Sequence, residues 1–358
     1  MKFKGSYLCG VVGVCLAFGA CGGSKTAPTP VSDPPQIACP AAPDPVESLD
    51  GSAQVVSFAA PTVTGGQPPL TTGCLPVSGA SFPVGTTTVT CTTSDAKART
   101  ATCSLPVVVL PPPKLSATSF VAFGDSITWG ENGANTASTR ALGQHVFVQL
   151  PPGERYPDIL QQELQARYKQ QTPTVFNAGC PGELLSAPGE FVAECFGARA
   201  DDPSAYRRFL TVASLKKFDA VLFMEGSNDV DVAAGDSTVL PTAVGYLQKM
   251  IDAAKSSGMK VVVATIPPMV PPGIDSRAKG YAVVPTYNGM VRALATSKTV
   301  PLADVNGAFG SDASSLIGPD GLHPNLSGYQ RIADTFLATI KSSLETATTS
   351  SQATRRRR

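Results

Sequence analysis

The stretch Ser119-Phe120-Val121-Ala122-Phe123-Gly124-Asp125-Ser126 decides the fold of most of this 358-residue chain. Residues 119–123 form a short apolar run, which is typical of a strand buried on both faces of a sheet. Gly124 and Asp125 predict a tight turn, because both residue types favour turns. A serine directly after such a turn presents its hydroxyl and its own N–H at the end of the strand. We therefore expect Ser126 at the carboxyl edge of a buried sheet.

Further strands alternate with helices downstream of this one. The expected strands are 174–177, 220–224, 260–265 and 299–303, and the expected helices are 156–168, 201–217, 242–257, 286–296 and 327–343. This alternation predicts a parallel sheet with helices on both faces, whose ligands lie beyond the carboxyl ends of the strands. Three more short strings follow these strands or lie in a late loop, at residues 177–182, 226–229 and 320–324.

Together the strings hold the groups that acyl transfer through a covalent intermediate requires. Asp320 stands three residues before His323, so its carboxylate can hold one ring nitrogen while the other faces Ser126. Gly179 has no side chain, so its N–H can approach a substrate oxygen closely. We expect Asn228 in the loop after the strand 220–224, where its amide is a neutral donor that can bind an oxyanion. Taken singly, each string has a structural explanation as a turn, a helix cap or a loop.

Residues 118–345, with these four strings in this order, resemble the SGNH hydrolases, also called the GDSL lipase/esterase family. The resemblance implies an α/β three-layer sandwich with a mainly parallel five-stranded sheet. It also implies the roles of the site residues. The implied catalytic residues are Ser126, Asp320 and His323, and the implied oxyanion hole consists of the Ser126 N–H, the Gly179 N–H and the Asn228 amide.

Two features near the site depart from the family pattern. Cys180 directly follows Gly179, and we expect it to pair with Cys195 and to close a loop beside the site. The segment 131–153 is long and holds polar, glycine and proline residues, so it is placed to shape the acyl or alcohol pocket. We interpret His145, within this segment, as a residue of the surface or the cleft rim.

Residues 37–110 have an all-β texture, with short alternating runs that glycine and proline interrupt. The pieces 82–95 and 101–109 resemble the HYR (hyalin repeat) module, which implies a small immunoglobulin-like β-sandwich. Its four cysteines allow three connectivities. Of these we favour Cys39–Cys103 with Cys74–Cys91. The module is interpreted as a spacer or as a ligand-binding domain.

The two ends of the chain and its linkers have no folded character. Residues 1–21 are typical of an export signal that ends in a bacterial lipobox, where Cys21 would carry lipid. Residues 22–36 predict a flexible tether, residues 111–117 a proline-rich linker and residues 346–358 a disordered tail. We therefore expect an exported, lipid-anchored protein of the bacterial cell envelope.

Charge and cysteine content exclude several other classes of protein. The chain has 28 Lys+Arg against 27 Asp+Glu, and removal of Lys2 and Lys4 with the signal leaves 28 − 2 = 26 against 27. A net charge of 26 − 27 = −1 gives no general attraction to nucleic acid. Six cysteines remain beyond Cys21, an even number that suggests disulfides in an exported protein. A metal site is not expected, because the sequence has no CxxC and only two histidines.

The sequence thus predicts a serine carboxylester hydrolase without a metal or organic cofactor. Its expected partners are an acyl ester substrate and, through Cys21, a membrane; no nucleic acid and no obligate protein partner is expected. One alternative is O-deacetylation of a polysaccharide or cell-wall glycan. Another, from a different class, is a non-catalytic surface adhesion or binding protein.

Overall fold

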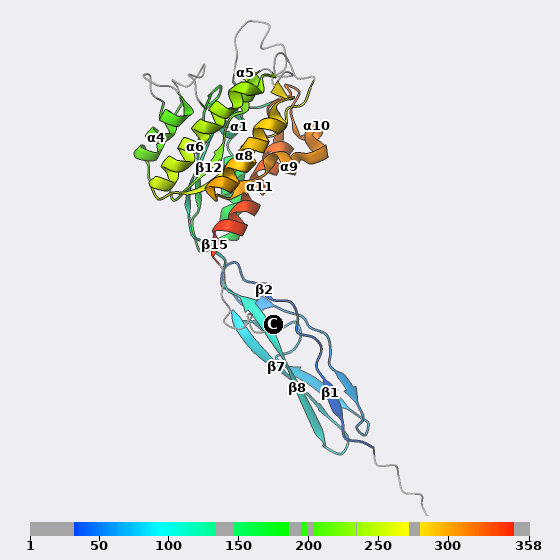
Figure 1. Cartoon of the computed structure of the whole chain (residues 1–358). Coiled ribbons are helices and arrows are strands. Elements are labelled where there is room, and N and C mark those ends of the chain that lie inside the picture. The colour runs from blue at the N-terminus through cyan, green and yellow to red at the C-terminus, as the bar shows by residue number, and fades with distance from the viewer. Residues whose placement is uncertain are drawn as a thin grey trace, which may run out of the picture.

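The computed structural model describes residues 32–133, 147–185, 195–198, 204–233, 235–271 and 280–346. The molecule is elongated, with an N-terminal domain of strands and a C-terminal domain of strands and helices (Figure 1). A short linker, which includes strand β9 (Lys114–Leu115), joins the two domains. The predicted fold class, a small all-β part followed by an α/β part, is confirmed.

The N-terminal domain is built from small sheets around a compact apolar core. Alternating residues of its two longest strands, β7 (Gly85–Ser94) and β8 (Thr100–Leu110), point inward, among them Val89 and Val107. Both expected disulfides, Cys39–Cys103 and Cys74–Cys91, are formed. One sheet has four strands in the order β2 (Val46–Glu47), β8, β7 and β5 (Thr71–Leu75). Two further sheets are pairs of strands: β1 (Gln36–Ala38) with β4 (Thr62–Thr64), and β3 (Gln54–Val55) with β6 (Ser81–Phe82).

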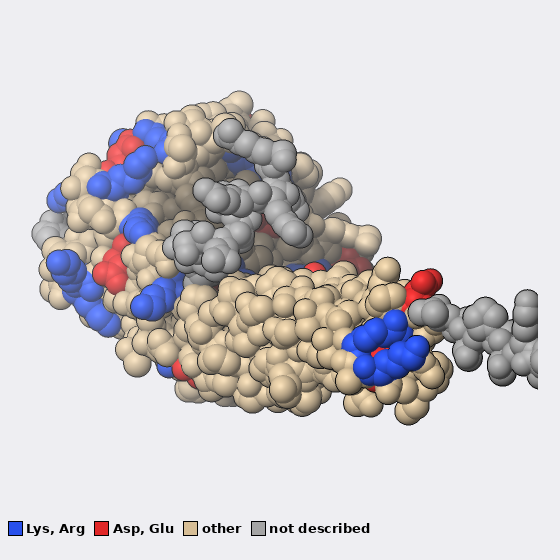
Figure 2. Space-filling model, turned by 90° about the horizontal axis from the view of Figure 1, so that it is seen from below, with Lys and Arg blue, Asp and Glu red and all other residues tan. Residues whose placement is uncertain are grey.

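The N-terminal domain carries few charged side chains. In the view of Figure 2 its surface is almost entirely uncharged, apart from a small cluster near the end where the grey trace leaves it. Arg99 of this domain binds Asp95 at 2.7 Å. Hydroxyl side chains take the exposed positions instead, because every second residue of β7 points to solvent.

The C-terminal domain contains one five-stranded sheet, and all of its strand pairs are parallel. This confirms the predicted fold class and places the carboxyl ends of all the strands at one edge. The order across the sheet is β11 (Thr174–Gly179), β10 (Ser119–Gly124), β12 (Ala220–Met224), β13 (Lys260–Ala264) and β14 (Leu302–Ala303).

Helices cover both faces of this sheet. Successive side chains of β10 point to opposite faces, so Val121 and Phe123 enter one apolar core while Phe120 and Ala122 enter the other. The first face is covered by α4 (Ala205–Leu215), α6 (Leu240–Ser256) and α8 (Val284–Lys298), and the second by α3 (Tyr156–Arg167) and α11 (Leu326–Leu344). These helices match the predicted ones to within a few residues; positions 201–203 lie outside the described residues.

The sequence did not predict the short helices near the carboxyl ends of the strands. Each is too short to show a helical repeat of apolar residues, which is the signal that identifies longer helices. They are α1 (Ser126–Trp129), α5 (Ser227–Ala233), η2 (Ser237–Val239), α9 (Val305–Phe309), η3 (Gly310–Asp312) and α10 (Ala313–Leu316). Within the described ranges, no helix is long and apolar enough to cross a membrane.

Arg167, the last residue of α3, links the two domains. Its guanidinium binds Glu47 of the N-terminal domain through two nitrogens, each at 2.9 Å. It also binds Glu345 at 2.9 and 3.0 Å, and the Tyr168 hydroxyl donates to the same carboxylate at 2.7 Å. Glu345 lies in β15 (Glu345–Thr346), which pairs with β9 in the linker. One arginine therefore ties the N-terminal domain, the linker strands and α3 together.

Replacing Arg167 with alanine should loosen this joint. We expect the free energy of unfolding to fall by about 1–2 kcal/mol, because hydrogen bonds to partly exposed charged groups contribute in this range. Small-angle X-ray scattering should show a wider spread of maximum dimensions, with ester hydrolysis unchanged. Lys298→Ala, which removes only the surface pair with Asp252, is the control. Identical scattering from Arg167→Ala and wild-type protein would contradict the prediction.

Candidate active site

Ser126 begins helix α1 directly beyond the carboxyl end of β10. The Asp125 side chain caps this helix by accepting a hydrogen bond from the Ile127 N–H at 2.9 Å. A Cβ atom on Gly124 would lie only 2.2 Å from the Met224 carbonyl, so no larger residue fits between β10 and β12 here. The turn therefore requires glycine, and it holds the serine at the edge of the sheet.

Ser126, His323 and Asp320 form a continuous chain of contacts. Ser126 Oγ lies 2.8 Å from His323 Nε2, and His323 Nδ1 lies 2.5 Å from Asp320 Oδ2. All three residues are buried. This is the geometry in which an imidazole can accept the serine proton while a carboxylate fixes the orientation of the ring.

Asp320 is held as an ionised acceptor. Burial alone would raise the pKa of its carboxyl, but contact with the His323 ring and hydrogen bonds from the Leu322 and His323 N–H groups lower the pKa below its usual value. The local turn therefore aims the carboxylate at the imidazole and keeps it charged. The sequence predicted this pair from the spacing of three residues between Asp320 and His323. In the structure both residues lie in one turn of the loop before α11.

Asn228 lies in the first turn of helix α5, not in the loop that the sequence analysis expected. The helix forms because Gly226, at φ +109°, reverses the chain and the Ser227 N–H donates to Asp125 Oδ2 at 3.2 Å. The Asn228 Nδ2 donates to the Glu183 carbonyl at 2.8 Å. An amide nitrogen carries two hydrogens, so one remains for a ligand in the site.

Gly179 is placed differently from its expected role. Its N–H donates to the Asn177 side chain at 2.9 Å, so this donor is already used. A Cβ atom at this position would lie 2.0 Å from the Trp129 N, which makes Gly179 a contact point between β11 and α1. Gly182 follows three residues later at φ +71°, and no hydrogen bond among the described residues uses its N–H. It precedes Glu183, whose carbonyl binds Asn228.

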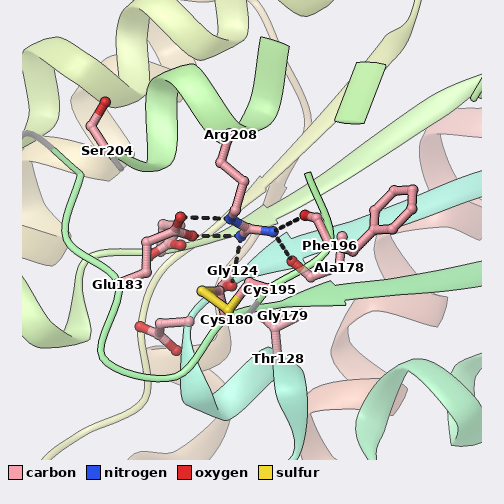
Figure 3. A network of polar contacts seen from close by, with 12 residues as sticks. Gly124, Thr128, Ala178, Gly179, Cys180, Glu183, Cys195, Phe196, Ser204 and Arg208 are labelled. Atoms are coloured by element: carbon pink, nitrogen blue, oxygen red, sulfur yellow. Dashed lines mark hydrogen bonds and ion pairs between the residues drawn. A yellow bond between two sulfur atoms is a disulfide. The ribbon is translucent and has the colours of Figure 1, made fainter. Parts of the chain in front are cut away.

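A buried arginine that the sequence analysis missed supports this loop. Arg208 on α4 binds both oxygens of Glu183, at 2.6 and 2.5 Å, and all of these side-chain atoms are buried (Figure 3). Its remaining N–H groups reach the carbonyls of Ala178 at 3.0 Å, Phe196 at 3.3 Å and Gly124 at 3.4 Å. One guanidinium thus joins the end of β10, the end of β11 and the loop that carries Gly182.

Three other buried acids, Asp125, Glu225 and Asp229, lie close enough for charge interactions with one another or with Glu183. Burial raises the pKa of Asp125, and burial together with the charges of Glu183 and Asp125 raises that of Glu225 well above its usual value. Burial also raises the pKa of Asp229 to about 7, although its side chain accepts the Leu185 N–H at 3.0 Å. Asp125 and Asp229 hold backbone turns, because they accept the N–H groups of Ile127 and Leu185.

The expected disulfide Cys180–Cys195 is formed and lies beside the Arg208 network (Figure 3). Cys180 is fully buried and its N–H donates to the Gly124 carbonyl at 2.8 Å. The disulfide therefore ties the segment after β11 to the chain that carries Phe196. Cys21 and His145 lie outside the described residues.

Metal-ligating side chains come close together at one place in the described part of the chain. Cys39, Cys91 and Cys103 have sulfur atoms within 4.8 Å of one another, and all three belong to disulfides. A disulfide sulfur is not a thiolate, so this cluster does not offer the ligands that a zinc site uses.

Comparison with known proteins identifies both domains. Residues 122–331 match the model of the GDSL-like Lipase/Acylhydrolase family, and residues 32–109 match that of the HYR domain. The first match spans more than half of the chain. The chain therefore belongs to the GDSL-like lipase/acylhydrolase family and is an ester-bond hydrolase. Its disulfides and its HYR domain, a module of extracellular type, indicate an exported protein.

Solved structures with a similar fold include two esterases. The aryl esterase of M. smegmatis is 18% identical, covers 64% of this chain and 100% of its own length, and has a TM-score of 0.50. Est24, a carbohydrate acetylesterase from Sinorhizobium meliloti, is 18% identical, covers 63% of this chain and 98% of its own, and has a TM-score of 0.48. No curated protein sequence matches the chain significantly.

Proposed function

We propose that this protein is a serine carboxylesterase that forms an acyl-enzyme on Ser126. The observation that carries the proposal is the buried chain of contacts from Ser126 Oγ through His323 to Asp320, at 2.8 and 2.5 Å. A serine hydroxyl is a weak nucleophile until a neighbouring base can take its proton, and this arrangement supplies the base.

In the first step Ser126 Oγ attacks the ester carbonyl carbon, and its proton passes to His323 Nε2. The carbonyl oxygen becomes an oxyanion, and the imidazolium then protonates the leaving alcohol. Asp320 stabilises the imidazolium from the Nδ1 side without taking the proton itself. In the second half His323 activates a water molecule, which releases the carboxylic acid and restores Ser126.

The oxyanion needs donors fixed in place before the reaction. The Ser126 N–H at the start of α1 and the free hydrogen of the Asn228 amide are two of them. Gly182 is our choice for the third, in place of Gly179, whose N–H already binds Asn177. The Gly182 peptide adjoins the Glu183 carbonyl that orients Asn228, so the two donors belong to one hydrogen-bonded unit.

One experiment tests the reaction class and surveys the substrate. Purified protein is assayed on p-nitrophenyl esters of graded acyl length and on acetylated glycans, and is then treated with a fluorophosphonate. We expect hydrolysis of at least one ester and a phosphonyl adduct on the Ser126 peptide. Protein that is denatured before treatment should form no such adduct. Acetylated glycans as the best substrates would select the deacetylase alternative. The proposal fails if no ester is hydrolysed above the buffer rate and Ser126 stays unlabelled.

The oxyanion hole leads to a second prediction. Asn228→Ala should lower kcat by about 10²–10³ with little change in KM, because the lost donor acts mainly on the transition state. Asn306→Ala, in the distant α9, should keep wild-type kinetics. In a crystal of the phosphonylated protein we expect the N–H groups of Ser126 and Gly182 within about 3 Å of the phosphonyl oxygen. A Gly179 N–H at that distance instead would overturn the choice of Gly182.

Membrane attachment through Cys21 is a further part of this proposal. The charged start, the apolar run and the small residues before Cys21 support it. Cys21→Ser should move the protein from the membrane fraction to the soluble exported fraction. Unchanged membrane association of this variant would count against the lipid anchor.

A further inference from the structure

A second carboxylate lies against the catalytic imidazole. Glu131 Oε2 is 3.1 Å from His323 Nε2, the same nitrogen that faces Ser126 Oγ. The side chains of Glu131 and His323 are only 2% and 1% exposed. The imidazole therefore has one carboxylate on each nitrogen, Asp320 at Nδ1 and Glu131 at Nε2.

The backbone fixes Glu131 in this place. Its N–H donates to the Ser126 carbonyl at 2.9 Å, and its own carbonyl accepts the Tyr329 hydroxyl at 2.7 Å. It also forms a β-bridge with Gln149. Two residues later, a Cβ atom on Gly133 would lie 2.5 Å from the His323 carbonyl, so the segment passes close along the catalytic histidine. The position of Glu131 is thus coupled to the nucleophile on one side and to α11 on the other.

We propose that Glu131 is a catalytic residue that stabilises the protonated Nε2 of His323 during ester hydrolysis. This inference rests on the proposed function. When Ser126 Oγ bonds to the acyl carbon, its proton moves to Nε2 and the ring becomes positive. The Glu131 carboxylate then faces a full positive charge across 3.1 Å in a buried site, where such attraction is strong. Glu131 takes no proton, and the proton passes from Nε2 to the leaving alcohol.

Stabilising the imidazolium has two opposite effects. It makes His323 a stronger base toward Ser126, which favours the attack. It also strengthens the hold on a proton that the ring must give up before each attack, because a protonated imidazole cannot activate the serine. Removing the carboxylate should therefore slow acylation at high pH and extend activity toward low pH.

The other ionisable groups around His323 remain in place when Glu131 is replaced. Asp320 contacts Nδ1 from the histidine's own loop, and Asp125 lies on the α1 side, where its charge interacts with the ring. Tyr329 on α11 stays neutral, because burial and the nearby carboxylates raise its pKa far above the usual value. A change in the pH profile can thus be assigned to the carboxylate at Nε2.

The test is the pH dependence of kcat/KM for Glu131→Gln, which keeps the size of the side chain and removes its charge. We expect a plateau about 10-fold lower and an acid limb that lies at lower pH, because removing an opposite charge beside an ionisable group disfavours the charged form of that group. Glu131→Asp keeps the charge and withdraws it by one methylene. The acid limb of this variant should therefore lie between those of the wild type and Glu131→Gln. Glu154→Gln, which removes one exposed acid, should superimpose on the wild type.

The outcomes separate this inference from the proposed function. If the wild type hydrolyses esters and Glu131→Gln has an unshifted acid limb, Glu131 has no such role and the esterase proposal stands. A plateau that falls in both Glu131 variants without any shift of the acid limb would show a structural role alone and would also overturn the inference. If the wild type hydrolyses no ester, the proposed function itself fails. Thermal unfolding of each variant confirms that the compared proteins are folded.

Discussion

Replacing Ser126 with alanine is expected to lower kcat by about 10⁶, because the residues of such a triad act as one unit. His323→Ala should cost about the same, and Asp320→Asn about 10⁴, since the wrong tautomer of the ring would then be held. The sharper expectation concerns the double variant. Ser126→Ala combined with His323→Ala should be no slower than either alone, because once the nucleophile is absent the base has nothing to activate.

Steady-state hydrolysis of the best p-nitrophenyl ester is the measurement for this series. Ser315→Ala serves as the control, because its hydroxyl only donates to the Asp312 carbonyl on the surface. Effects of Ser126→Ala and His323→Ala that multiply in the double variant would show that the two residues act independently. The chain of contacts from Ser126 to Asp320 would then not be the catalytic unit.

Replacing Arg208 with methionine is expected to be the most destabilising single change in the described part of the hydrolase domain. The substitution keeps much of the apolar stem, but it leaves the buried Glu183 carboxylate without its arginine donor and removes one hydrogen bond from each of three backbone carbonyls. Breaking a buried ion pair from one side typically costs about 3–5 kcal/mol. The Arg208 guanidinium also lies 4.0 Å from the centre of the Phe123 ring, and that contact is lost as well.

The same substitution should also impair catalysis in the protein that still folds. Glu183 carries the carbonyl that orients Asn228, and the loop with Gly182 depends on Glu183 for its position. Glu225 lies close enough to Glu183 for their charges to interact, so loss of the arginine leaves two acids in a site without a balancing charge. We therefore expect lower kcat in addition to lower stability, measured at a temperature where the variant is folded.

Two further variants test this explanation. Arg292→Met breaks an ion pair with Asp304 in which both side chains are more than a third exposed, and it should cost about 0–1 kcal/mol. Arg208→Met combined with Glu183→Leu removes both buried charges and should recover part of the lost stability. Chemical denaturation of these proteins measures the difference. A cost for Arg208→Met as small as that for Arg292→Met would contradict the role assigned to the network.

The sequence predicted those parts of the site that local chemistry determines. Asp320 and His323 are three residues apart in one turn, and Ser126 follows the turn that ends an apolar strand, so short strings are enough to identify them. The regular alternation of strands and helices likewise predicted the parallel sheet. Asn228 was predicted as a site residue but placed in a loop, because helix α5 is too short to show a periodic pattern.

Contacts between distant segments could not be predicted in this way. Arg208 binds Glu183, which lies 25 positions earlier in the sequence. Glu131 contacts His323 because the loop with His323 packs beside the end of α1, although nearly two hundred residues separate them in the sequence. Neither residue belongs to a motif. Gly182 could have been considered from the sequence, since it is the second glycine in the string 177–182. Only the structure shows that the N–H of the first glycine, Gly179, already donates to the Asn177 side chain.

The pairing of β9 with β15 has a consequence for how this hydrolase domain can be reused. Leu115 and Glu345 lie opposite each other, so the domain begins and ends at one spot, on its side toward the N-terminal domain and away from α1 (Figure 1). A unit with adjacent ends can be placed inside a loop of a host protein or can be circularly permuted with little loss.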